Sequence, residues 1–341
     1  MNVLVRGAFG NVGTTVTALL LDFRQALGIN KVFTHKRTLL PWTLDAVDRI
    51  RAFGAIPCSD APTPQFVELD RIKGDINYIF ECGAEGVGLH ERQDYSTYPK
   101  LLAACAQGSE KGFGIPYMLG VNDDIILGEQ YVQVVSCNCH GIASLMAVFA
   151  GRGLEGLSEA DFVVVRRSED LGSHARLVGA NVVVRHLDPP HGTHHARDVM
   201  DLFQTVAAYP TLRTSDINTP SQLLHSVRFA ITLRSALGQN DIEARLAAAA
   251  SVSTTKLFDS NAVFDTGRRH GFHGRLYDHA IVVSNMLMVE QATIRGWAFV
   301  PQEGATILST IAAFLRQTRH PGTAAVLALL GKRLQTHSPR G

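Results

Sequence analysis

The first half of the chain alternates short apolar runs with segments of helical length, and this alternation limits the possible folds more than any other feature. The apolar runs cover 3–6, 31–34, 78–82 and 131–136. Segments with helical periodicity cover 11–27, 44–53 and 94–106. Strands separated by helices of this length predict βαβ units, because neighbouring strands of a parallel sheet need a crossover connection between them.

The second half has a different pattern, in which long β-rich runs dominate. These runs cover 162–166, 181–185, 227–233, 280–289 and 293–300. Two helices are expected at 197–208 and 241–250, a last helix at 304–315, and a frayed tail from Lys332. Successive strands with few helices between them indicate an α+β domain with a mostly antiparallel sheet, so we place a domain boundary near Ser136.

Composition excludes several classes of protein. Hydrophobic residues make up 46% of the 341 residues and charged residues 18%, which excludes an intrinsically disordered chain. Thirty-two Lys and Arg balance thirty-one Asp and Glu, so no net field favours nucleic acid or an anionic membrane as a partner. Apolar stretches such as 323–330 are shorter than the ~18 residues of a membrane span, and the N-terminus lacks signal-peptide features. Five cysteines without disulfide spacing favour a reducing compartment, so we expect a soluble cytoplasmic enzyme.

A glycine-rich turn, GAFGNVG, joins the first expected strand to the first expected helix. Gly7, Gly10 and Gly13 would let the backbone turn tightly and approach a pyrophosphate at the helix N-terminus. Ala8 departs from a strict G-x-G-x-x-G spacing. The turn predicts a dinucleotide site, and the alternative is a strand-to-helix turn that binds no ligand.

The end of the second expected strand bears on which dinucleotide would bind. A site that prefers NAD places a carboxylate there to hold the ribose hydroxyls. This chain has Thr34 followed by His35, Lys36 and Arg37, and no carboxylate before Asp45. Cationic donors suit a 2′-phosphate, so NADP is the expected cofactor, with NAD also possible. The alternative is a solvated basic loop.

Cys137 follows the apolar run YVQVVS and opens a segment, 138–148, of helical pattern. At a helix N-terminus, unpaired amides and the macrodipole favour a thiolate, which attacks carbonyl carbons. The alternative is a small core residue, as we expect for Cys58, Cys82 and Cys105. The run Cys137-x-Cys139-His140 and the histidine-rich stretches 191–195 and 270–279 lack a second ligand pair at metal-site spacing, so we predict no metal.

Several segments together resemble the archaeal-type (type II) glyceraldehyde-3-phosphate dehydrogenases. They are GAFGNVG, AEGVG at 84–88, GSEK at 108–111, SCN at 136–138, RR at 166–167 and HHARDV at 194–199. Their order and separation follow that family over roughly 3–315, and VVSCN and HHARDV are the most specific stretches.

The resemblance implies a fold, an activity and an assembly. The implied fold is α/β, with a Rossmann-like doubly wound cofactor domain at 1–136 and an α+β catalytic domain at 137–301. A C-terminal helix segment at 302–330 would pack back on the first domain, ahead of a flexible tail at 331–341. Members of the family are homotetramers that use NADP or NAD. They oxidise a small phosphorylated aldehyde through a cysteine thioester and release it to inorganic phosphate as an acyl phosphate.

The resemblance also assigns site residues. Cys137 matches the nucleophile, and His225 in PSQLLH matches a histidine that follows P-T-T-x-x in the family and acts as the base. The alternative for His225 is a histidine buried in the core. One of Arg166 and Arg167 could instead form a structural ion pair, and His194 and His195 could instead cap a helix. The substrate and phosphate positions are Asn138, Cys139, His140, Arg166, Arg167, His194 and His195. The cofactor positions are Gly7, Phe9, Gly10, Asn11, Val12, Gly13, His35, Lys36, Arg37, Gly83, Gly86 and Gly108.

The chain departs from the family pattern directly after SCN. The family continues with two threonines, whereas this chain has Cys139 and His140, and the residues around Arg295 and Trp297 also differ. A thiol and an imidazole in place of two hydroxyls would change the shape and charge of the pocket. The alternatives are therefore a related oxidoreductase for a different semialdehyde or acyl phosphate, or an inactive paralogue that binds a nucleotide.

Overall fold

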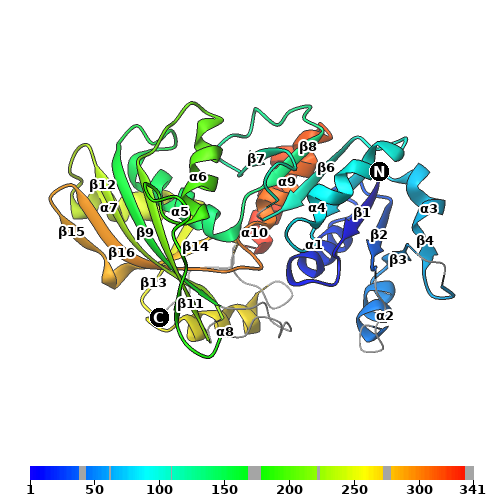
Figure 1. Cartoon of the computed structure of the whole chain (residues 1–341), viewed down its shortest axis with the longest axis horizontal. Coiled ribbons are helices and arrows are strands. Elements are labelled where there is room, and N and C mark those ends of the chain that lie inside the picture. The colour runs from blue at the N-terminus through cyan, green and yellow to red at the C-terminus, as the bar shows by residue number, and fades with distance from the viewer. Residues whose placement is uncertain are drawn as a thin grey trace. The chain divides into compact units, whose positions relative to one another are not determined.

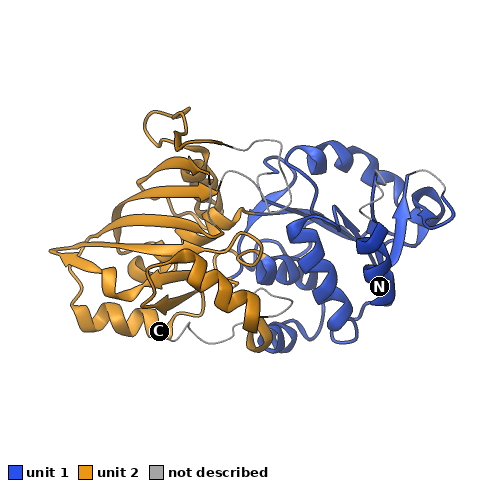
Figure 2. Ribbon diagram, turned by 90° about the horizontal axis from the view of Figure 1, so that it is seen from below, with its two compact units in different colours: residues 1–119, 123–134, 307–330 blue, residues 120–122, 135–306, 331–341 orange. Residues whose placement is uncertain are grey.

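Two sheets organise the chain, each at the centre of its own unit (Figure 2). The computed structural model describes residues 1–37, 44–60, 63–108, 110–167, 178–220, 223–271 and 278–334. The first unit comprises residues 1–119, 123–134 and 307–330, and the second comprises 120–122, 135–306 and 331–341. The expected flexible tail lies mostly outside the described residues.

The first unit contains a parallel eight-stranded sheet of Rossmann type, in the order β4-β3-β2-β1-β5-β6-β8-β7 (Figure 1). Every neighbouring pair is parallel. The strand order reverses between β1 and β5, and ligands of doubly wound sheets bind at such a reversal. The strands are β1 (Asn2–Arg6), β2 (Lys31–His35), β3 (Ile56–Ser59), β4 (Val67–Glu68), β5 (Tyr78–Glu81), β6 (Ala103–Gln107), β7 (Ile115–Tyr117) and β8 (Tyr131–Val134).

Helices cover this sheet because its strands are apolar on both faces. Val3, Leu4 and Val5 in β1 are all fully buried. Tyr78 in β5 packs edge-on against Phe314, with ring centroids 4.9 Å apart, and so attaches a helix from the end of the chain to the first sheet. The helices are α1 (Asn11–Asp22), α2 (Leu44–Ala52), α3 (Leu69–Ile72), α4 (Val87–Glu91), α9 (Ile307–Gln317) and α10 (Thr323–Leu334), with 3₁₀ turns at Lys73–Asp75 and Arg92–Thr97.

The second unit contains a mixed, mostly antiparallel sheet in the order β10-β11-β9-β12-β16-β14-β13, with β15 paired to β16. Only the pairs β11·β9 and β13·β14 are parallel in the described chain. The strands are β9 (Leu157–Arg167), β10 (Val182–Val183), β11 (Leu212–Thr219), β12 (His225–Leu233), β13 (Val252–Thr255), β14 (Ala280–Val283), β15 (Met288–Glu290) and β16 (Thr293–Val300). The helices are α5 (Cys137–Ala150), α6 (His194–Gln204), α7 (Gln239–Ala248) and α8 (Ser260–His270), with a 3₁₀ turn at Ser284–Met286.

Burial in this unit alternates along the strands, as a sheet with one covered face requires. In β12 every second residue from His225 to Leu233 is buried. Helix α5 is apolar over most of its surface and contacts β9, β12, β14 and β16. Helix α5 begins at Cys137. Strand β9 ends at Arg167, and strand β12 begins at His225.

The predicted fold class is confirmed, but several element predictions are wrong. The segment 94–106 is a 3₁₀ turn followed by strand β6, whose AACAQ sequence favours helix yet lies buried in the middle of the sheet. The run 280–289 is divided by a 3₁₀ turn. Helix α1 ends at Asp22 rather than at 27, and helices α8 and α10 lie where no helix was expected.

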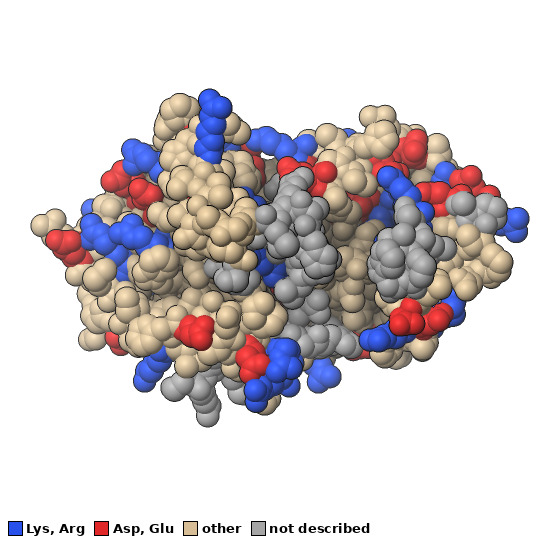
Figure 3. All heavy atoms as spheres, turned by 60° about the horizontal axis from the view of Figure 1, so that its bottom comes forward, with Lys and Arg blue, Asp and Glu red and all other residues tan. Residues whose placement is uncertain are grey.

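Two further observations concern the surface and the helices. Basic and acidic side chains are intermingled over the face of the molecule that Figure 3 shows. Among the described residues, no helix combines the length and the apolarity that crossing a bilayer requires.

Candidate active site

Cys137 is the first residue of helix α5, and its side chain is half-buried. Ser136 precedes it in an extended conformation, and its Oγ accepts a hydrogen bond from the Cys139 amide at 3.4 Å. This is an N-cap, in which a short hydroxyl side chain satisfies one of the free amides of the first turn. The predicted position of Cys137 at a helix N-terminus is therefore correct.

The electrostatic surroundings of Cys137 do not favour the thiolate. Burial raises the pKa of the thiol to about 11, because a thiolate loses hydration there. The Arg167 guanidinium opposes this increase, and the Glu303 carboxylate adds to it. The Arg166 guanidinium and a hydrogen bond from the Asn138 backbone also lower the pKa of the thiol, but burial outweighs these contributions.

Arg167 and Arg166 are adjacent in β9 but have different environments. Arg167 is buried, with its NH2 group 2.6 Å from Glu303 Oε1, in an ion pair whose side chains are 3% and 6% exposed. The Arg166 side chain is one-third exposed, and its NH1 group lies 3.6 Å from Asp216 Oδ2. Neighbouring residues of a strand point to opposite faces. Arg166 is therefore the more accessible of the two arginines for binding an anion, and Arg167 is held in an ion pair.

His225 begins β12 and is buried, directly beside β9. Its Nδ1 accepts a hydrogen bond of 3.4 Å from the Arg167 amide. Burial, followed by the charges of Arg167 and Arg166, lowers the pKa of His225 well below the usual value, so the ring is neutral at pH 7. A neutral ring that accepts at Nδ1 carries its proton on Nε2, and so presents a donor there rather than a proton acceptor.

His195, in the first turn of α6, forms a buried pair with Asp216 of β11. Its Nε2 lies 3.2 Å from Asp216 Oδ2, and the side chains are 3% and 0% exposed. Burial opposes ionisation of this carboxyl, but the hydrogen bonds from His195 and Thr193 lower the pKa of Asp216 below its usual range. Asn138 Nδ2 approaches the same ring nitrogen at 3.3 Å, whereas the neighbouring His194 is exposed.

Cys139 and His140 are directed into the protein interior, away from any exposed surface. Cys139 is fully buried, and its thiol is 3.9 Å from the His195 carbonyl oxygen. His140 Nδ1 lies 3.1 Å from the Ser136 carbonyl oxygen, and burial lowers the pKa of the imidazole to about 4. This geometry does not support the expectation that these two residues contact the substrate.

A pocket of about 230 Å³ lies in the first unit, where β1, β2 and β5 end. Gly7 has a φ of +65°, and a Cβ there would lie 2.3 Å from the Cys82 carbonyl oxygen. A Cβ on Gly13 would lie 2.1 Å from the Gly7 carbonyl oxygen, so the fold itself requires both glycines. A Cβ on Gly10 would meet only one atom, at 3.4 Å. The lining residues are Arg6, Gly7, Phe9, Gly10, His35, Lys36, Arg37, Glu81, Gly83 and Val87.

Five of the predicted cofactor residues are not part of the pocket lining: Asn11, Val12, Gly13, Gly86 and Gly108. Asn11, Val12 and Gly13 form the first turn of α1, where no acidic side chain is present and the N-cap, Gly10, offers no side chain. Gly86 and Gly108 have φ of +84° and +76°, which lie in the left-handed region that glycine adopts without steric cost. These two glycines do not line the pocket.

Carboxylates reach the basic residues of the pocket from distant parts of the sequence. His35 Nε2 lies 2.8 Å from Asp60 Oδ1, and Arg37 forms ion pairs with Asp60 and Glu91. Arg6 pairs with Glu91 at 2.7 Å and with Glu81 at 3.2 Å. The sequence has no carboxylate between Thr34 and Asp45, but the fold brings acids from distant parts of the chain to the basic segment.

No protein-family model matches the chain. Several curated proteins are similar to it over part of their length. The glyceraldehyde-3-phosphate dehydrogenase of Methanobacterium bryantii is 28% identical over 180 residues, which are 52% of this chain and 50% of that protein. The enzyme of the same name from Methanobacterium formicicum is 29% identical over 174 residues, 50% of this chain and 48% of that protein. The one from Sulfolobus acidocaldarius is 27% identical over 176 residues, 51% of this chain and 48% of that protein.

Similarity to several archaeal glyceraldehyde-3-phosphate dehydrogenases supports a divergent protein that resembles these enzymes. The similarity agrees with the two-domain fold, in which a parallel Rossmann-like sheet and a mixed sheet occur in one chain. It spans about half the length of the curated relatives.

The resemblance to glyceraldehyde-3-phosphate dehydrogenases did not indicate Glu303 or Asp216. Glu303 lies 136 residues from Arg167, outside every motif, so only the folded chain reveals the pair. Asp216 had a signal in the sequence, because it follows Leu212 and Thr214 at the inward-facing positions of β11. A carboxylate at a core-facing strand position needs a partner, which here is His195.

Proposed function

We propose that the chain is a nicotinamide-dependent dehydrogenase that oxidises a small phosphorylated aldehyde through a thioester on Cys137. The observation that carries the proposal is the position of Cys137, half-buried at the start of α5 and within the electrostatic influence of two arginines. The kinship with glyceraldehyde-3-phosphate dehydrogenases supports the same chemistry.

The position of the pocket in the first unit supports a dinucleotide site. It lies at the reversal of strand order and beside the free amides of the first turn of α1, where a pyrophosphate is stabilised. The small residue at Gly10 leaves the backbone open to such a ligand. Lys36 and Arg37 would hold a 2′-phosphate, which supports NADP, with NAD as the alternative. When bound, the nicotinamide would supply the hydride acceptor.

Different residues of the second unit would act as the nucleophile and as the hydrogen-bond donor. Cys137 Sγ bonds to the aldehyde carbon while the thiol proton passes to the carbonyl oxygen, giving a thiohemiacetal. Nε2–H of His225 would donate to that oxygen and stabilise its developing charge. The hydroxyl proton then has to pass to a base as the carbon loses a hydride. His225 Nε2 takes this proton only in the opposite tautomer, after the ring gives up the hydrogen bond from the Arg167 amide.

Phosphate release would use the accessible cationic groups. Inorganic phosphate attacks the thioester carbon, and the Cys137 sulfur departs as the leaving group and regains a proton. Arg166, whose Nε has no hydrogen-bond partner among the described residues, is suited to hold a phosphate oxygen. Asn138 and the exposed His194 are the further groups proposed for this anion site, whereas His195 is buried against the Asp216 carboxylate.

The proposal extends to assembly and location. By analogy with the family, we propose a cytoplasmic homotetramer whose partners are a small aldehyde and phosphate, with no nucleic acid and no membrane. The alternative of a pocket reshaped by Cys139 and His140 is weakened, because both side chains face the interior.

The test is an assay with glyceraldehyde 3-phosphate, phosphate and NADP or NAD, in parallel with a panel of semialdehydes. Turnover that depends on both aldehyde and phosphate supports the proposal. Turnover of another semialdehyde alone would assign a related oxidoreductase. The inactive-paralogue alternative requires that the protein binds nucleotide but reduces none with any aldehyde.

A further inference from the structure

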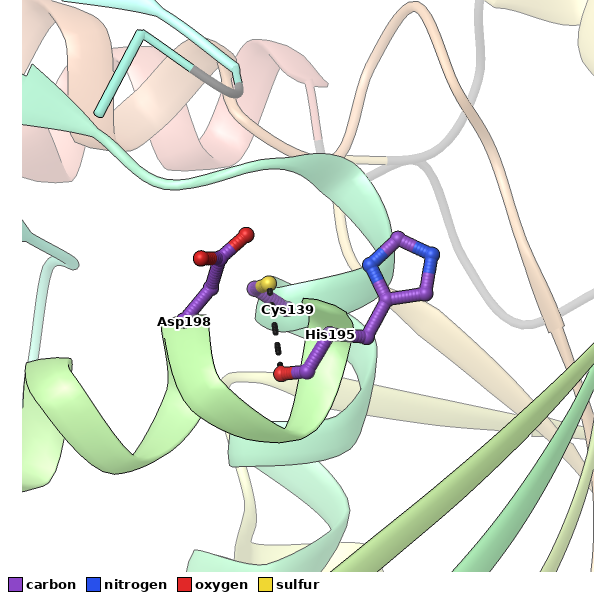
Figure 4. Close-up of side chains that lie close together, drawn as sticks. All are labelled: Cys139, His195 and Asp198. Atoms are coloured by element: carbon purple, nitrogen blue, oxygen red, sulfur yellow. Dashed lines mark hydrogen bonds between the residues drawn. The ribbon is translucent and has the colours of Figure 1, made fainter. Parts of the chain in front are cut away.

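The N-terminal halves of α5 and α6 bring a thiol, an imidazole and a carboxylate together (Figure 4). Cys139 belongs to α5, whereas His195 and Asp198 lie three residues apart on α6 and therefore share a face of that helix. One ligand atom from each of the three side chains lies within 4.8 Å of the other two. This is a mixed donor set, and it comes from two different helices.

The imidazole of His195 has an unused nitrogen. Its Nε2 lies 3.2 Å from Asp216 Oδ2, with Asn138 Nδ2 at 3.3 Å from the same nitrogen, and the buried carboxylate favours the tautomer that carries the ring proton on Nε2. Nδ1 then keeps its lone pair. This nitrogen is buried and has no hydrogen-bond partner among the described residues, and in Figure 4 it lies on the side of the ring that faces Cys139. A buried acceptor without a donor is costly unless a ligand completes it.

We propose that Cys139, His195 and Asp198 bind a divalent transition-metal ion of the zinc class. A thiolate, an imidazole nitrogen and a carboxylate oxygen are the protein ligands that Zn²⁺ accepts, and three of them leave a fourth position for water. The Asp216–His195 hydrogen bond matches the carboxylate–histidine–metal arrangement, in which an outer carboxylate orients the ligand ring.

The distances require only a small closure of the site. Ligand bonds of about 2.0–2.3 Å in a tetrahedron set donor atoms roughly 3.3–3.8 Å apart. The present separations of up to 4.8 Å therefore close by about 1 Å when the side chains rotate. The Cys139 thiol gives up its proton to solvent when its sulfur bonds to the ion. Ser136 Oγ, 3.2 Å from that sulfur, stays as a donor to the thiolate.

A second grouping, of His194, His195 and Asp216, has the same spacing but fits a cation less well. In that grouping Asp216 would itself be a ligand, so its 3.2 Å contact with His195 would be lost. The Arg166 guanidinium also lies 3.6 Å from Asp216 Oδ2 and would repel a cation there. The Cys139 grouping keeps both of these interactions.

The experiment measures metal binding directly and does not depend on dehydrogenase activity. The full chain is stripped with a chelator and titrated with Co²⁺ and Zn²⁺. We expect one ion per chain and a thiolate-to-cobalt charge-transfer band. Cys139→Ser should abolish the band and weaken binding by at least about tenfold, and Asp216→Asn should weaken it by about 10–100-fold. Cys137→Ser and His194→Ala are the matched controls, and both should retain the band.

Other results would overturn the proposal. Absence of the band in the unmodified chain, or its persistence in Cys139→Ser, would exclude Cys139 as a ligand. Loss of the band in Cys137→Ser or in His194→Ala would assign the ion to a different set. Asp198→Asn, checked for native circular dichroism, separates lost ligation from lost folding, because it is expected to weaken binding without changing the helical signal.

Discussion

Arg167 and Glu303 form a buried ion pair, 2.6 Å between NH2 and Oε1, in the electrostatic surroundings of Cys137. The two charges act on the thiol in opposite directions, because the guanidinium favours the thiolate and the carboxylate disfavours it. The pair therefore limits how strongly Arg167 activates the nucleophile, and its integrity should be visible in the reactivity of Cys137.

Replacing Glu303 tests this relationship. In chelator-treated protein, alkylation of Cys137 by iodoacetamide should rise with pH toward the thiol pKa of about 11, because only the thiolate reacts. Glu303→Gln removes the negative charge, so the pKa should fall and alkylation at pH 8 should become faster. Breaking a buried pair also costs stability, on the order of 3–5 kcal/mol.

The matched control for this variant is Glu290→Gln, because Glu290 pairs with Arg295 at an exposed position. Its alkylation profile should equal that of the unmodified protein. An unchanged profile in Glu303→Gln would show that the buried pair does not influence the thiol.

The two adjacent arginines should have different roles in solution. Arg166→Gln removes an accessible cation, so the KM for phosphate or for the phosphorylated aldehyde should rise, with a smaller loss of stability than in Arg167→Gln because Asp216 keeps His195 and Thr193 as partners. Arg167→Gln leaves the Glu303 carboxylate buried without its partner, so thermal unfolding should occur at a clearly lower temperature. The reverse assignment, with Arg167 controlling KM at normal stability, would refute this division.

Two variants of His225 distinguish a hydrogen-bond donor from a base. Glutamine keeps an N–H group in roughly the place of Nε2–H, whereas alanine keeps none. If His225 acts as a donor, His225→Gln should retain a kcat well above that of His225→Ala. Because the pKa of His225 lies well below its usual value, the rate should show no loss from its protonation between pH 7 and 6. Equal and complete loss in both variants would instead favour the base that the sequence predicted.

The glycines of the first turn should separate folding from cofactor binding. Gly13→Ala places a Cβ 2.1 Å from the Gly7 carbonyl oxygen and should destabilise the first unit strongly. Gly10→Ala meets one atom at 3.4 Å and should fold normally, but its methyl group lies at the pocket and should weaken NADP binding. Isothermal titration with NADP, together with thermal unfolding, measures both effects. Tight NADP binding by Gly10→Ala would place the dinucleotide elsewhere.

Periodicity predicted much of the fold because it reports how side chains face the core. Strand β12 is buried at every second residue, and its apolar alternation is visible in the sequence. Strand β6 was mistaken for helix, since alanines favour helix locally while burial between neighbouring strands decides the outcome. The short strands β3, β4 and β7 have too few residues to show a period.

The site was predictable only where a local motif carries it. Cys137 stands at a strand-to-helix junction, which a linear sequence reveals. Glu303 follows β16 and pairs with Arg167, and Asp216 lies in β11 and pairs with His195. The members of each pair are far apart in sequence, so the pairing depends on the folded chain. Cys139 and His140 share a motif with Cys137 but face the interior, because successive residues of a helix point in different directions.

The most direct measurement of the proposed chemistry is mass spectrometry of the protein after incubation with glyceraldehyde 3-phosphate and NADP in the absence of phosphate. The proposal predicts one acyl group on Cys137, formed with one equivalent of NADPH, which disappears when phosphate is added and does not form in Cys137→Ser. Formation of NADPH by Cys137→Ser, or an acyl group on another residue, would contradict it.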